Sequence, residues 1–224
     1  MNILTIDLDF FWSSSKTAYA DKKKELTKDY NRFFQIFKTI SFLNIKVGID
    51  HSELLYLLDE TDKTEINITN LDAHHDFYIT NPKWWILDYG MRGLNVEIGN
   101  FFFFLMREEK IKTFDWIIPE YFSLENTRKE LENYLGNYYA NQIKSHFLAN
   151  YTFQRSYDLL YVCISPEWIP ISDSKWIKEW LKLCNLNNSD TNNLIFQVEN
   201  RWKLGDDNEL INENRFKYPL DSML

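Results

Sequence analysis

The sequence predicts an α/β fold of three layers, in which helices cover both faces of a mostly parallel β-sheet. Short apolar segments with the composition of buried strands recur along the chain. They are residues 2–7, 44–49, 65–71, 114–118, 158–165 and 194–198. Segments with helical spacing separate several of these strands, and that alternation is typical of parallel strands joined by helices. No repeat or Pro/Gly-rich linker divides the chain, so we expect one domain over residues 1–224.

Helices are predicted where apolar residues recur about every 3.6 positions or where a capping pattern begins. The first is expected over residues 20–42, which carry an apolar and aromatic stripe. Another is expected to start near Thr127, because Thr127 and Glu130 form a capping box. A third should follow Ser174, where tryptophans and aliphatic residues share one face.

The composition narrows the class of protein. A net charge of −8 argues against a nucleic-acid surface and is compatible with a cationic substrate. An apolar run of about 18 residues, which a membrane span requires, does not occur. The N-terminus lacks the pattern of a signal peptide, and the two cysteines lie outside metal or redox spacing. We therefore expect a cytoplasmic protein that contacts neither nucleic acid nor membrane.

Three apolar segments end abruptly in aspartate and histidine, as strands do at the carboxyl edge of an α/β sheet. Carboxylates that crowd together need positive charge, and a pair of divalent metal ions is the simplest source. Oxygen-rich ligation with one histidine for each metal suits Mn²⁺ better than structural zinc. The candidate ligands are Asp7, Asp9, His51, Asp72, His74 and Asp76. In an extended chain, Asp7 would share a face with Asp9, and Asp72 with His74 and Asp76.

These segments resemble the metal-binding motifs of the arginase and agmatinase (ureohydrolase) family, whose enzymes carry two manganese ions. The stretch Val47-Gly48-Ile49-Asp50-His51-Ser52 resembles the family's Gly-Gly-Asp-His-Ser strand end. Asp72-Ala73-His74-His75-Asp76 fits its Asp-Ala-His-x-Asp, and Thr5-Ile6-Asp7-Leu8-Asp9 resembles its Ser-x-Asp-x-Asp. The resemblance implies an arginase-like fold and two Mn²⁺ ions, with Fe²⁺ or Co²⁺ as alternatives.

The resemblance also implies how the ligands are shared. One metal would take His51, Asp72, Asp76 and Asp7, and the other Asp72, His74, Asp7 and Asp9. Asp7 and Asp72 would then bridge the two ions.

The chain departs from the family in the order of its motifs. The Asp-x-Asp segment comes last in familiar arginases but opens this chain, so a permuted or rearranged sheet is expected. The family's downstream catalytic histidine has no evident counterpart, because His146 is expected on a helix. The compact length and the opening Asp-Leu-Asp-Phe resemble the small atypical peptide arginases, which convert arginine to ornithine within ribosomally made peptides.

The implied reaction is hydrolysis of an arginine guanidinium to ornithine and urea by a metal-bridging hydroxide, with an arginine-containing peptide as the substrate. The guanidinium arrives charged, so a carboxylate should orient it. Glu167 and, second, Glu120 follow apolar strands in matching Pro-Glu-aromatic contexts. Asp76 could also shuttle a proton, whereas His75 is expected to turn away from the metals.

Other functions stay open. A haloacid-dehalogenase-type phosphatase would use Asp7 as nucleophile and Asp9 as acid/base, with residues 205–208 as its second acidic motif. That hypothesis gives residues 72–76 no role. A helical phosphohydrolase using His51, His75 and Asp76 conflicts with the strand-like run before Asp72. A third possibility is a non-catalytic metal-binding module that recognises peptides.

Overall fold

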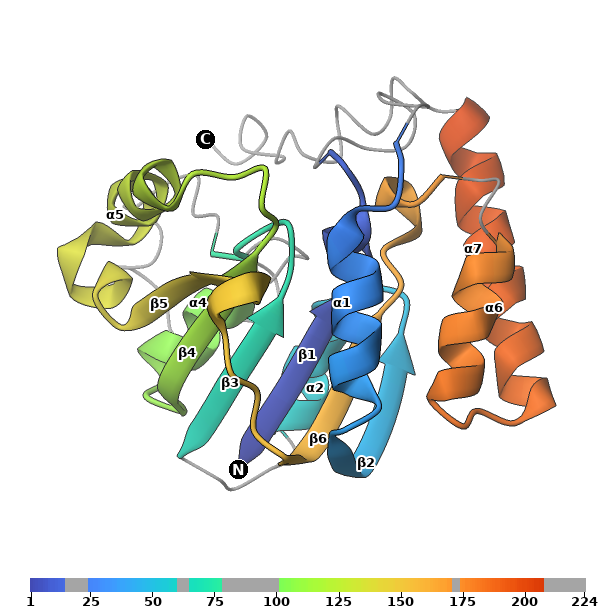
Figure 1. The fold of residues 1–224 in the computed structure, drawn as a ribbon, viewed down its shortest axis with the longest axis horizontal. Helices are drawn as coiled ribbons and strands as arrows, with labels where there is room; N and C mark the ends of the chain where they lie inside the picture. Colours follow the sequence, from blue (N-terminus) through green and yellow to red (C-terminus); the bar gives the residue numbers. More distant parts are fainter. Residues whose placement is uncertain (15–23, 60–64, 78–100, 171–173, 208–224) are drawn as a thin grey trace, which may run out of the picture.

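The computed structural model of the chain contains a six-stranded sheet with helices on both faces (Figure 1). It describes residues 1–14, 24–59, 65–77, 101–170 and 174–207. The strands lie in the order β2-β6-β1-β3-β4-β5, and every pairing between them is parallel. Their bounds are β1 Asn2–Asp7, β2 Ser41–Gly48, β3 Ile66–Leu71, β4 Ile111–Ile118, β5 Ile143–Phe147 and β6 Ser156–Cys163. The predicted αβα fold class is confirmed.

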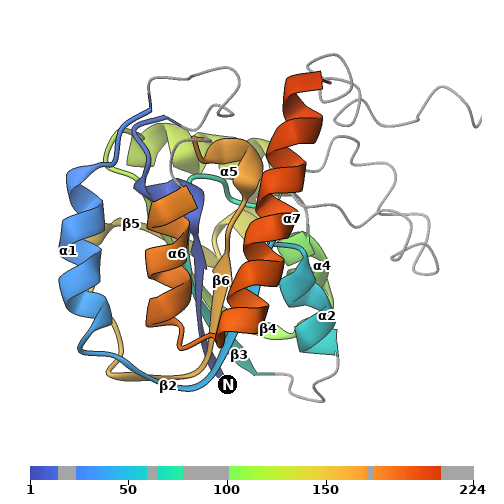
Figure 2. The same cartoon turned by 90° about the vertical axis from the view of Figure 1, so that its right-hand side faces the viewer.

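Helices flank this sheet on both sides. The α-helices are α1 Lys28–Phe37, α2 Glu53–Asp59, α4 Phe101–Arg107, α5 Leu124–Ala140, α6 Ser174–Leu183 and α7 Asn188–Asp207. Short 3₁₀ turns follow three strands, namely η1 Leu8–Phe11, η3 Leu148–Asn150 and η4 Pro166–Trp168. In Figure 2, α1 and α6 lie on one side of the sheet, whereas α2 and α4 lie on the other.

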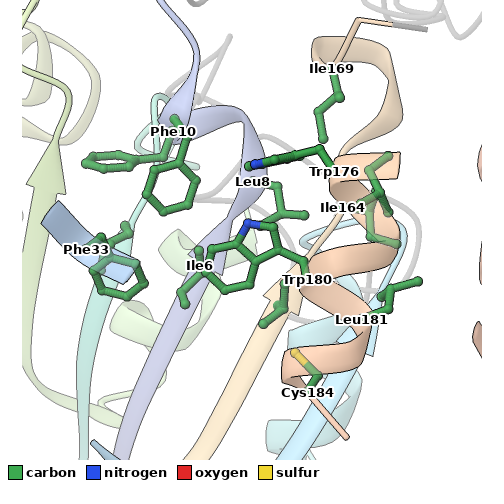
Figure 3. Close-up of a cluster of buried hydrophobic side chains, with 14 of the residues drawn as sticks. Ile6, Leu8, Phe10, Phe33, Ile164, Ile169, Trp176, Trp180, Leu181 and Cys184 are labelled. Carbon is green, nitrogen blue, oxygen red and sulfur yellow. The ribbon is translucent and has the colours of Figure 1, made fainter. Parts of the chain in front are cut away.

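Alternation along the strands divides the buried side chains into two cores. In β1, Leu4 and Ile6 pack with α1, α6 and α7, whereas Ile3 packs with α2, α4 and α5. Figure 3 shows Trp180 of α6 beside Ile6 in the first core. Its ring also stacks on Phe11, with centroids 5.6 Å apart. Each face of the sheet is therefore closed by its own apolar cluster, and the polar residues collect at the strand ends.

Several predicted elements are wrong in type or in bounds. Residues 194–198 belong to α7, because Ile195, Val198 and Trp202 recur at helical spacing and are buried on one face. The edge strand β5 was not predicted, and it contains His146, which therefore does not lie on a helix. Short apolar runs fit either structure until the neighbouring elements are known.

Two helices start at other residues than predicted. α1 begins at Lys28, and residues 20–23 lie outside the described part of the chain. α5 begins at Leu124 and is capped by Ser123, whose Oγ accepts a hydrogen bond from the Asn126 amide at 3.4 Å. The predicted cap, Thr127, lies in the first turn of this helix and is buried.

The strand order brings together segments that are distant in sequence. β6 lies between β2 and β1, and β3 pairs with the other side of β1. The carboxyl ends of β2, β6, β1 and β3 are consequently neighbours. Loops after adjacent parallel strands are where α/β proteins build their sites.

Candidate metal centre

The six predicted ligands meet at the carboxyl ends of β1, β2 and β3. Two groups of donor atoms form there, and within each group the atoms lie within 4.8 Å of one another. One group contains Asp7, His51 and Asp72, and the other contains Asp9, Asp72 and His74. Asp72 belongs to both groups. The buried cluster could therefore hold metal ions, with one histidine on each side of a shared carboxylate.

His51 defines the first side of the centre. Its Nδ1 lies 3.0 Å from Oδ2 of Asp72 and 2.9 Å from Oδ2 of Asp76. Oδ2 of Asp7 is 3.8 Å from the same nitrogen. The His51 side chain is fully buried, so these carboxylates face it without solvent between them.

His74 defines the second side. Its Nδ1 lies 2.9 Å from Oδ2 of Asp9 and 3.9 Å from Oδ1 of Asp72. The two oxygens of Asp72 thus face different histidines. This is the arrangement that a bridging carboxylate needs when two metals lie about 3.5–4 Å apart.

The donor atoms fit a divalent cation better than they fit hydrogen bonds. Asp9 Oδ2, His51 Nδ1 and Asp76 Oδ2 are buried and have no hydrogen-bond partner among the described residues. They nevertheless lie within 3.0 Å of oppositely charged or polar atoms. Donors placed about 2.0–2.2 Å from a common metal are separated by roughly such distances. The orphaned atoms are therefore directed toward a shared centre.

The pKa values of the ligands in the metal-free protein also indicate a site for cations. Burial, followed by the charges of Asp9 and Asp72, raises the pKa of Asp7 well above its ordinary value. Burial and the charge of Asp76 raise the pKa of Asp72 to about 7. Burial opposes protonation of His74, but the charge and hydrogen bond of Asp9, together with the charges of Asp72 and Asp76, raise the pKa of His74 to about 10. The site takes up protons because it lacks positive charge, which metal ions would supply.

Local turns bring the ligands together, and the prediction that extended chain would align them is wrong. Asp9 lies in η1, and its amide donates to Asp7 Oδ1 at 3.1 Å. The His74 amide donates to Asp72 Oδ1 at 2.7 Å, which bends the chain after β3. Asp76 has a left-handed backbone with φ 55°, a conformation that aspartate tolerates better than most residues. Side chain to backbone bonds compete here with the extended conformation.

The loop that carries His51 is held by Glu53 and shaped by Gly48. Glu53 Oε1 accepts hydrogen bonds from the amides of Ile49 and Asp50, both at 3.1 Å. A Cβ at Gly48 would overlap the Tyr161 hydroxyl, so only glycine fits this close approach. The Tyr161 ring in turn lies parallel to His51, with ring centroids 6.0 Å apart.

The two candidate carboxylates for substrate binding are paired with cations of the chain itself. Glu167 Oε1 accepts a hydrogen bond from Arg201 Nη1 at 2.8 Å, while Oε2 is buried without a hydrogen-bond partner among the described residues. Glu120 is bound by Lys28 and Arg32, and the Lys28 ammonium is the main cause that lowers its pKa.

The two histidines outside the ligand set lie elsewhere. His75 is buried beside the ring of Trp116, and its Nε2 is 3.7 Å from Glu130 on α5. It therefore turns away from the ligands, as predicted. His146 Nε2 lies 3.1 Å from Asp115 Oδ1 on the neighbouring strand β4.

Sequence reasoning missed several residues that contact the ligands, and Thr5, Ser165 and Trp168 are among them. Thr5 Oγ1 lies 2.5 Å from His51 Nε2, and Ser165 Oγ donates to Asp7 Oδ2 at 2.5 Å. The ring of Trp168 meets His74 edge to face, with centroids 5.4 Å apart. Thr5 lies two residues before Asp7 and so shares its face of β1, which is a signal the sequence contained. Nothing in the sequence showed that the end of β6 lies beside Asp7.

Comparisons with family models, with curated proteins and with solved structures found no match for this chain. Its class is therefore defined by the fold and the site, as an α/β protein with a buried aspartate–histidine cluster suited to metal binding. No described helix is both long enough and apolar enough to cross a membrane.

Proposed function

We propose that this protein is a metal-dependent hydrolase that converts arginine within a peptide to ornithine and urea. The observation that supports this best is the division of Asp72 between two ligand groups, each with one histidine. The resemblance of the three sequence segments to ureohydrolases implies a similar division, with Asp76 added to the first group and Asp7 to the second. Aspartate and imidazole donors of this kind favour Mn²⁺, with Fe²⁺ or Co²⁺ as alternatives.

His51, Asp72, Asp76 and Asp7 would hold one ion, and Asp72, His74, Asp7 and Asp9 the other. A metal pair at this place supplies Lewis-acid polarisation and a water of lowered pKa. Side chains of the protein must bind the guanidinium, orient it and transfer protons. Asp76 is our candidate for proton transfer, because its Oδ2 lies 2.9 Å from His51 Nδ1 and has no hydrogen-bond partner among the described residues.

The structure contains a guanidinium held beside the proposed centre, and this supports the choice of Glu167. Arg201 of α7 donates from Nη1 to Glu167 and from Nη2 to Asp50 Oδ2, the latter at 2.6 Å. Asp50 directly precedes the ligand His51, and Trp168 directly follows Glu167 and contacts His74. Two carboxylates at the edge of the cluster are thus arranged to recognise a guanidinium. Oε2 of Glu167 is buried and has no hydrogen-bond partner among the described residues, and it is our candidate acceptor for the guanidinium of a substrate.

Replacing Glu167 by glutamine is expected to raise KM for an arginine peptide by about 10-fold or more, since a hydrogen bond to a charged group contributes about 1.5–3 kcal/mol. Metal content should stay unchanged. Steady-state kinetics with metal analysis would check this. Arg201→Ala is the matched control, because it removes the internal ion pair and leaves the carboxylate. If Arg201→Ala raises KM equally, Glu167 acts only by holding α7. If Glu120→Gln alone raises KM, the role passes to Glu120.

The phosphatase hypothesis receives less support from the geometry. Asp7 is hydrogen-bonded by Ser165 and by the Asp9 amide, and it faces His51. Residues 205–207, part of the proposed second acidic motif, lie in α7 rather than after a strand. The helical phosphohydrolase hypothesis requires His75 beside His51, whereas His75 lies against Glu130.

Mass spectrometry of arginine-containing peptides incubated with Mn²⁺-loaded protein tests the proposed function. Each converted arginine should lose the mass of urea less water, and free arginine should be turned over more slowly. Equal turnover of free arginine would refute the peptide assignment. Metal-dependent phosphate release from a phosphomonoester without any peptide change would favour the phosphatase. Silence in both assays, with metal bound, would favour a non-catalytic peptide-binding module.

A further inference from the structure

We infer that Ser165 and Thr5 are positioning residues of the metal centre: Ser165 orients the Asp7 carboxylate, and Thr5 fixes which nitrogen of His51 faces the metals. This rests on the metal centre of the proposed function but not on its arginine chemistry. Neither residue belongs to the predicted ligand set. Both are buried, at 4% and 0% exposure, and each contacts a ligand through its hydroxyl.

Ser165 reaches Asp7 because of the strand order. β6 lies between β2 and β1, so the residue just beyond its end can contact both neighbours. The Ser165 amide donates to the Ile49 carbonyl at 3.0 Å, which ties it to the end of β2. Its hydroxyl donates to Asp7 Oδ2 at the end of β1. One residue thereby links the loop that leads to His51 with the carboxylate expected to bridge the metals.

The backbone of Ser165 is strained in a way that serves this contact. Its φ of 46° and ψ of 63° lie in the left-handed region, which costs energy for a residue with a Cβ. Such conformations persist where the surroundings hold them, and they concentrate at functional sites. A glycine would fit this turn with less strain but could not offer a hydroxyl. The presence of serine is explained by the hydrogen bond to Asp7.

The two hydrogen bonds on Asp7 fix the plane of its carboxylate. Oδ1 accepts from the Asp9 amide and Oδ2 accepts from Ser165. Each carboxylate oxygen has a second lone pair, which stays available to a metal. A carboxylate that is hydrogen-bonded at both oxygens keeps its orientation in the metal-free protein.

Thr5 acts on the tautomer of His51. A neutral imidazole that ligates through Nδ1 must carry its proton on Nε2, and the partner of Nε2 selects that tautomer. Thr5 Oγ1, 2.5 Å from Nε2, is placed to accept that proton as a hydrogen bond. The ring cannot easily flip, because it lies against Tyr161 and Phe101. Nδ1 is then left to face Asp72 and Asp76.

A calorimetric titration of the metal-free protein with Mn²⁺ alone measures the metal affinity and tests the inference. Loss of a residue that supports a ligand typically weakens metal binding by about 10–100-fold, and we expect that range for Ser165→Ala and for Thr5→Val. Thr5→Ser should restore the affinity, because it returns the hydroxyl. Thr69→Val is the matched control: Thr69 is also a buried strand threonine, but its Oγ1 lies 3.1 Å from the Tyr151 hydroxyl instead of a ligand.

Two further measurements separate positioning from general damage to the fold. In protein loaded with diamagnetic Zn²⁺, the Nε2 proton of His51 should give a slowly exchanging NMR signal that Thr5→Val loses and Thr5→Ser keeps. Ser165→Gly should weaken Mn²⁺ binding as much as Ser165→Ala does, although it relieves backbone strain. Wild-type affinity in both Ser165 variants, or in Thr5→Val, would overturn the role of that residue.

Measurements of Mn²⁺ binding and of arginine conversion test the two positioning roles and the proposed function separately. Wild-type protein that binds no Mn²⁺ would overturn both. Wild-type protein that binds Mn²⁺ but leaves arginine peptides unchanged would overturn the arginine chemistry alone, and the two positioning roles would still be judged by their variants.

Discussion

Replacing Asp72 by asparagine is expected to reduce metal content to near zero and to abolish arginine hydrolysis. Asp72 Oδ2 faces His51 and Oδ1 is directed toward His74, so one substitution weakens both groups of ligands. The change is nearly isosteric, and the main-chain carbonyl of residue 72 should keep its hydrogen bond from Trp116 Nε1 at 3.0 Å. Loss of metal should therefore come from loss of charge rather than from unfolding.

The stability of the Asp72→Asn variant separates these causes. Burial raises the pKa of Asp72 to about 7, so its ionised form is disfavoured in the metal-free protein. Removing that carboxylate should leave the metal-free protein at least as resistant to urea as wild type at neutral pH. Metal analysis and urea unfolding measure both properties. Asp115→Asn is the control, because Asp115 also pairs with a histidine, His146, but lies outside the ligand set. Two metals retained in Asp72→Asn would contradict a bridging role.

The metal-free protein is expected to lose stability as pH rises, and bound metal should reduce that loss. The pKa of Asp72 rises from 3.8 to about 7 on folding, so the folded state keeps a proton that the unfolded chain releases above pH 3.8. Stability therefore falls between pH 3.8 and about 7. The pKa of His74 rises from 6.5 to about 10, so its contribution is full below pH 6.5 and is lost as pH approaches 10. Asp72 and His74 therefore both make the free energy of unfolding of the metal-free protein decrease as the pH rises.

Metal ions replace these protons, so Mn²⁺ affinity should increase with pH and binding should release protons. Urea unfolding on either side of pH 7, with chelator or with Mn²⁺, measures the change in stability. A ligand that binds only the folded protein adds about 2.7 kcal/mol at 100 times its Kd. The Asp72→Asn variant should show a smaller pH dependence below pH 7. A pH-independent Mn²⁺ affinity would contradict the protonated state of the metal-free cluster.

The ligands could be identified from the sequence because two general rules of α/β folds apply to the same residues. Apolar strands that end in Asp or His predict polar side chains at the sheet edge, and parallel strands place those edges together. All six predicted ligands converge at this edge, although local turns, which these rules do not predict, bring Asp9, His74 and Asp76 into place. The fold class follows from the same alternation of strands and helices. By contrast, residues 194–198 were assigned to a strand, because five apolar or amide residues do not distinguish a strand from a turn of buried helix.

Contacts between distant segments were decided only by the tertiary structure. The position of β6 between β2 and β1 brings Ser165 to Asp7, which is 158 residues away in the chain. The packing of α7 brings Arg201 to Glu167 and Asp50. The sequence by itself determined which residues can bind metal, because that property belongs to the side chains and to the ends of their own strands. Which hydroxyls and cations support them depends on strand order and helix packing, which local periodicity does not encode.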